Sequence, residues 1–215
     1  MSYKLLKPYT QEEKNDFIVK YNRKLGLEIK ETSIALYALL PNEIMVNGEP
    51  TADPDYEAKE AQKVQVELVE YNYEAKAKKA YGGILINDTY LFETNETSQS
   101  MITASLIGLQ NAPDETTLNW KVYANNKPIV VPLTKVQLAQ LFAFALNMIN
   151  TSFGLEGTRN NDLTTATVEQ LNDETWVEQY KIATDFAFNQ INNKIDVVLV
   201  ANPTETPNIE NIEEV

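Results

Sequence analysis

Four pairs of adjacent carboxylates are the residues of this 215-residue chain that could do acid–base chemistry: Glu12-Glu13, Asp114-Glu115, Asp173-Glu174 and Glu213-Glu214. Catalysis of the glycosidase kind needs two carboxyl groups that face each other across the scissile bond. Adjacent side chains on a helix point about 100° apart, so adjacency does not provide that geometry. Acids also stabilise the first turn of a helix through its dipole. We therefore interpret the pairs as capping and solubility features, and we predict no catalytic residue.

Asn160, Asn161 and Asp162 offer oxygen atoms that a calcium ion could use. A calcium-binding loop places such ligands at alternate positions and closes with a bidentate Glu, and this segment has neither feature. The glycines at 82–83 and at 154 and 157 do not form a phosphate-binding loop of the GxGxxG kind. The sequence therefore predicts no metal and no cofactor.

The chain contains no His and no Cys. Ser-His-Asp and Cys-His catalysis, His-ligated iron or haem, and the common zinc sites each lose a required group. Disulfide bonds are excluded as well. Composition thus removes most familiar enzyme chemistries, and we expect a protein that is not an enzyme.

Acidic residues outnumber basic ones by 31 to 18, which gives a net charge of −13. A basic surface for phosphate backbones or anionic lipids is missing, so we expect no nucleic-acid partner and no membrane partner. The longest unbroken apolar run, at 34–40, has seven residues, far fewer than the ~20 that span a bilayer. An acidic DNA mimic is an alternative, but the 16 Lys interspersed with the acids interrupt a continuous negative stripe.

The elements that position these residues begin with a compact α+β module at 1–50. Thr10 and Glu13 form a capping box, which predicts a helix at 11–25 that ends at Gly26. Two short strands are expected at 27–29 and 44–46. By composition, residues 47–55, at the end of this module and beyond it, are a linker.

A long helix is expected from about 55 to 79, within a linker and connecting segment at 51–80. Ala61, Val64, Leu68, Tyr71 and Ala75 repeat at the 3-4 spacing of a coiled-coil seam. Two interpretations stay open. The helix is either a solvated connection that lies on its own domain, or a surface for self-association or docking with Val64, Leu68 and Tyr71 as interaction residues.

A second module is expected at 81–200. Its elements are a hairpin of strands 82–86 and 89–93 around Asn87-Asp88, a helix at 96–110, a hairpin of strands 120–123 and 129–131, a helix from Thr134 to about Asn150, a helix at 174–193 and a strand at 197–200. Pro128 and Pro132 indicate that the outer strand of the second hairpin is an edge. Trp120 is either a core anchor or an interface hot spot. The polar segment 201–215 is predicted to be a disordered acidic tail.

These elements predict an α+β fold of two small modules, each with short strands or hairpins packed on helices, joined by a long helix. The two modules are expected to fold separately, with a boundary near 55 or 80.

Residues about 81–171 resemble a family of unknown function in proteins of tailed phages and prophages, often encoded near tail-fibre genes. The matching pattern is GGILINDTYLFETNETSQSMITASLIG at 82–108, NWKVYANNKPIVVPLTKVQLAQLFAFAL at 119–146 and TTATVEQL at 164–171. This chain lacks the His residues usual in that family and has a longer C-terminal extension.

The resemblance implies a non-catalytic structural or accessory component of a tailed-phage virion, located in the tail, a fibre or another appendage. Such a protein would be made in the cytoplasm of the bacterial host, and its partners would be other virion proteins, with a homo-oligomer as a further state. A tail-fibre assembly chaperone is the alternative within the same class, and a glycan depolymerase is the enzymatic alternative.

Overall fold

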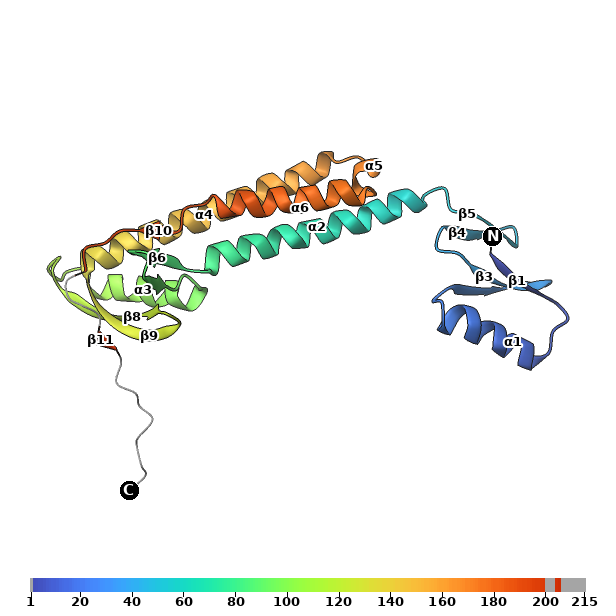
Figure 1. The fold of residues 1–215 in the computed structure, drawn as a ribbon, viewed down its shortest axis with the longest axis horizontal. Coiled ribbons are helices and arrows are strands. Elements are labelled where there is room, and N and C mark those ends of the chain that lie inside the picture. Colours follow the sequence, from blue (N-terminus) through green and yellow to red (C-terminus); the bar gives the residue numbers. More distant parts are fainter. Residues whose placement is uncertain (1, 200–203, 206–215) are drawn as a thin grey trace, which may run out of the picture. The chain divides into compact units, whose positions relative to one another are not determined.

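The computed structural model describes residues 2–199 and 204–205 (Figure 1). The chain divides into two compact units, Met1–Val64 and Gln65–Val215. Both combine helices with small sheets, so the predicted α+β class is confirmed. The boundary lies inside the segment expected to connect the modules. Apart from 204–205, the expected acidic tail lies outside the described residues.

The first unit is built around one strand that is buried on both faces. Its sheet has the order β1-β3-β2, formed by β1 (Tyr3–Leu6), β3 (Ala35–Leu39) and β2 (Glu28–Glu31). Leu36 and Ala38 pack against Phe17 of α1 (Gln11–Ile18), which continues as a π-helix over Val19–Arg23. Tyr37 and its neighbours on the other face pack with Met45. The predicted capping box and the left-handed Gly26 (φ +69°) are confirmed.

The expected linker at 47–55 is partly wrong. It contains β5 (Glu49–Ala52), which pairs with β4 (Glu43–Val46) through a hairpin at Asn47-Gly48. Both turn residues have positive φ, which this tight turn requires. The Asn-Gly signal outweighed the Pro-containing composition that had suggested a linker.

The second unit contains a six-stranded sheet. Its strands are β6 (Ile84–Ile86), β7 (Tyr90–Phe92), β8 (Thr117–Ala124), β9 (Lys127–Thr134), β10 (Lys194–Ile195) and β11 (Thr204–Glu205). They lie in the order β10-β6-β7-β8-β9-β11. The two predicted hairpins are present, and their turn residues at 87–88 and 125–126 all have positive φ. The strand expected at 197–200 is absent from the described part of that segment, and pairing occurs earlier, at β10.

Two helices cover one face of this sheet: α3 (Glu96–Gly108) and the first half of α4 (Lys135–Thr165). The core between them is formed by alternate residues of each strand, with Ile102, Leu138, Leu141 and Met148 from the helices. Alternation places the neighbouring strand residues on the opposite face.

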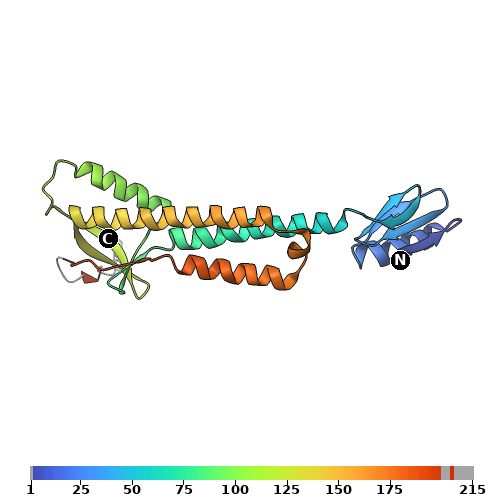
Figure 2. The ribbon, with the colours of Figure 1, turned by 90° about the horizontal axis from the view of Figure 1, so that it is seen from above.

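α4 is longer than expected, because it continues through Gly154 and Gly157 to Thr165. The second half packs against α2 (Tyr56–Tyr81) and α6 (Glu174–Asn189), with α5 (Val168–Leu171) between α4 and α6 in the chain (Figures 1 and 2). Tertiary packing of this kind outweighs the weak helix propensity of glycine. By length and composition α4 is also apolar enough to cross a membrane, yet its apolar side contributes to the core of the unit.

The interior of this three-helix bundle combines apolar side chains such as Leu68 and Leu163 with buried polar and charged groups. Lys76 of α2 is buried, with its Nζ 3.3 Å from Glu156 of α4, and the ammonium lies over the rings of Tyr73 and Phe153. Arg159 reaches α6, where its Nε donates to the hydroxyl of Thr184 at 3.0 Å. Because such groups are costly to bury alone, their mutual contacts fix how the three helices align.

Candidate binding groove

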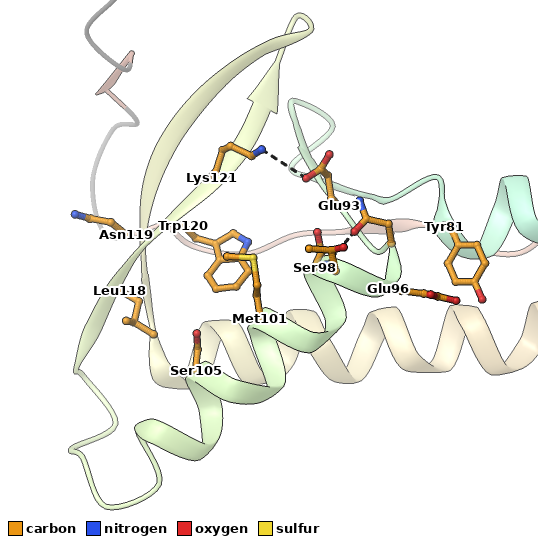
Figure 3. A pocket seen from close by; sticks show the side chains of 12 residues that line it. Tyr81, Glu93, Glu96, Ser98, Met101, Ser105, Leu118, Asn119, Trp120 and Lys121 are labelled. Carbon is orange, nitrogen blue, oxygen red and sulfur yellow. Dashed lines mark hydrogen bonds and ion pairs between the residues drawn. The ribbon is translucent and has the colours of Figure 1, made fainter. Parts of the chain in front are cut away.

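A groove of about 840 Å³ opens in the second unit beside strand β8 (Figure 3). One wall is residues 118–121 of β8, the other is the N-terminal two thirds of α3, and the segment before α3 closes one end. A volume of this size is typical of a binding site. Both walls belong to the same compact unit.

The floor of the groove is apolar. Trp120 lies near the centre, and Met101 of α3 also lines the floor (Figure 3). The indole stacks on the ring of Phe92, whose centroid is 5.9 Å away and whose side chain is fully buried. Met101 is 57% exposed, which is unusual for a large apolar side chain on a packed helix. The buried ring of Phe92 therefore holds Trp120 in place, while Met101 is exposed to solvent on the groove side.

Polar and charged groups form the rim. Asn95 caps α3 by accepting a hydrogen bond from the backbone of Ser98 at 2.9 Å, and Glu96 lies in the first turn. Glu93 lies 3.9 Å from the ammonium of Lys121. Contact with Tyr123, and then the charge of Glu93, raise the pKa of Lys121. Two carboxylates and one lysine thus surround one end of an apolar floor.

The groove also contains a backbone edge. β8 pairs with β9 over its whole length, but β7 meets β8 only at Leu91 and Tyr123. Among the described residues, no strand lies against the other edge of β8 at Asn119 and Lys121. The side chain of Asn119 points away from Trp120 in Figure 3, so Asn119 contributes its backbone to the groove.

Of the predicted interaction residues, Trp120 lies in this groove, but the α2 stripe does not form a free surface. Leu68 is fully buried within its own chain, and Tyr71 is half-buried. Burial, and then a hydrogen bond with Asp185 of α6, raise the pKa of Tyr71 to about 12. Val64 is half-buried at the end of the first unit. For Leu68 the docking interpretation is wrong, because α4 and α6 of the same chain occupy that side of α2.

The other candidate residues have structural roles. Asn160 accepts a hydrogen bond from Asn72 inside the bundle, and Asp162 pairs with Arg159. Glu13 completes the cap of α1, and Asp173 caps α6. Among the described residues, no group of three Asp or Glu side chains could hold a metal ion.

Sequence reasoning missed Met101 and the edge of β8. One signal could have found the edge, because Pro128 and Pro132 lack N–H groups and therefore fix which residues of β8 can bond to β9. The opposite wall comes from α3, and the sequence alone gives no distance between α3 and β8.

The chain matches no protein-family model, no curated protein and no solved structure. The resemblance of residues 81–171 to a tailed-phage family therefore stays a prediction.

Proposed function

We propose that this protein is a non-catalytic structural or accessory component of a tailed-phage virion that acts by protein–protein contact through the groove beside β8. The groove is the observation that carries the contact part of the proposal. Its centre is an anchored Trp with an exposed Met beside it, and its rim is polar. Aromatic residues and Met within a polar rim are typical of protein interfaces. The resemblance at 81–171 supports the assignment to a virion.

The test is mass spectrometry of purified particles from the phage or prophage that encodes the chain. We expect the protein in the particles, and we expect Met101→Glu to reduce its incorporation at least tenfold, because a carboxylate on the apolar floor is left without a partner. Ile107→Glu is the matched control. Ile107 lies on the same helix, is 66% exposed and does not line the groove.

Absence of the protein from finished particles would overturn the proposal. If particles then failed to assemble without the gene, the chain would instead act as an assembly chaperone. Equal incorporation of both variants would remove the groove from the contact.

A further inference from the structure

We infer that the groove binds an extended segment of a partner protein as an added β-strand along the free edge of β8. The inference rests on the proposed contact function and specifies its mode. The expected occupant is apolar at alternate positions and carries a basic residue at one end. Its backbone would pair with Asn119 and Lys121, while its apolar side chains cover Trp120 and Met101.

Two prolines establish the direction of the backbone groups of β8. Pro132 lies opposite Asn119, and Pro128 lies opposite Tyr123. A hydrogen-bonded antiparallel pair needs an N–H from both residues, and proline has none. Neither position is therefore a hydrogen-bonded pair of the β8–β9 ladder. Asn119 and Tyr123 must direct their N–H and C=O groups away from β9.

Alternation extends this result to Lys121, which lies between them at the same phase. The two-residue turn at 125–126 gives the same phase independently, because it makes Ala124 and Lys127 the first hydrogen-bonded pair. Tyr123 meets Leu91 of β7 on that side. Asn119 and Lys121 have no strand there among the described residues, and both line the groove.

The dimensions fit one short strand. Thr117–Lys121 presents five residues beyond the pairing with β7, or about 17 Å at ~3.4 Å per residue. Strand addition takes its affinity from such main-chain bonds and its specificity from pockets for alternate side chains. Trp120 and Met101 supply an apolar contact for those side chains.

Charge selects the occupant. Glu93 and Glu96 lie at one end of the groove, and Lys121 is their only cationic neighbour among the residues that line it. The chain as a whole carries a net charge of −13, which disfavours an acidic segment or a second copy of this chain. A basic residue on the partner would face Glu96.

The test uses the full chain with Trp176→Phe, so that Trp120 is the single fluorescent indole. The probes are capped heptapeptides with Lys first and with Val, Leu, Phe or Tyr at alternate positions. The best binder is then remade with N-methyl groups on either alternating set of backbone amides. Only one set can face β8, so one isomer should bind at least tenfold more weakly, while the other keeps its affinity.

One protein variant and one altered peptide complete the test. Asn119→Pro removes one N–H that faces the groove, at a position where the β9 ladder uses none, and should weaken binding by a similar factor. A peptide with Glu in place of the first Lys should also bind more weakly. If Asn119→Pro does not fold, the two N-methyl isomers still decide.

Absence of binding by the whole panel, or equal loss or retention with both N-methyl isomers, would overturn strand addition. The proposed function is tested separately: it fails if the protein is absent from the particles and is not needed for their assembly.

Discussion

Asn72 of α2 and Tyr180 of α6 meet inside the bundle, where the Asn72 amide donates to the Tyr180 hydroxyl at 2.9 Å. The same amide donates to Asn160 of α4 at 2.8 Å, and Tyr180 donates to the carbonyl of Arg159 at 2.7 Å. Asn72 is completely buried, and its Oδ1 has no partner among the described residues. One side chain therefore connects all three helices while carrying an unsatisfied acceptor.

Asn72→Ala should lower the free energy of unfolding of the second unit by about 1–3 kcal/mol, because Asn160 and Tyr180 each lose a buried partner. Both Trp residues lie in this unit, so urea denaturation followed by Trp fluorescence reports on it alone. Asn161→Ala is the control, because Asn161 is exposed on the same turn of α4 as Asn160, and it should change stability by less than about 0.5 kcal/mol. Equal midpoints for the two variants would show that the Asn72 contacts add nothing.

The buried ion pair of Lys76 and Glu156 should behave as a coupled unit. Glu156→Gln leaves a buried ammonium without its counter-charge, with an expected loss of about 3–5 kcal/mol. The double variant Lys76→Met with Glu156→Leu should be more stable than Glu156→Gln, because an apolar pair of similar volume has no desolvation penalty. A double-mutant cycle of Lys76→Met, Glu156→Leu and their combination, followed by urea denaturation, measures the coupling. Additive losses would contradict this expectation.

Turn and cap chemistry made part of the fold predictable, because these signals are local. The Asn87-Asp88 turn and the capping box of Thr10 and Glu13 act within four residues, and both were confirmed. Gly154 and Gly157 misled, because their helical state depends on α2 and α6, which are distant in sequence. Of the site, only Trp120 was predictable by residue type.

Stability of the first unit should depend on pH through Glu31. Its carboxylate is bonded by Lys14, Tyr9 and Lys7, in decreasing order of effect, and these contacts lower its pKa to about 2. A lowered pKa in the folded state contributes stability above the ordinary value of 4.5, and this contribution is lost as pH falls from 4.5 towards 2. Glu31→Gln should flatten that decline, as measured from the amide NMR signals of β3. An unchanged pH profile in this variant would contradict the assignment.

Replacing glycine with alanine should stabilise the second unit at two positions and destabilise it at a third. Gly154 and Gly157 are helical, and a Cβ at either meets nothing within 4 Å, so Ala should stabilise the unit by about 0.5–1 kcal/mol at each position. Gly83 has φ +90°, and its Cβ would lie 2.8 Å from the carbonyl oxygen of Phe92. Gly83→Ala should therefore destabilise the unit. Thermal unfolding compares the three, and destabilisation at 154 or 157 would show that α4 needs its glycines.

The prolines of β9 also limit what the sheet can recruit. Exposed strand edges promote aggregation when they present an unbroken row of donors and acceptors to another chain. Pro128 and Pro132 remove alternate donors from the outer edge of β9, where β11 pairs only at Ile129 and Val130. The two prolines thus limit growth of the sheet beyond β9 and oppose edge-to-edge pairing between copies of this chain.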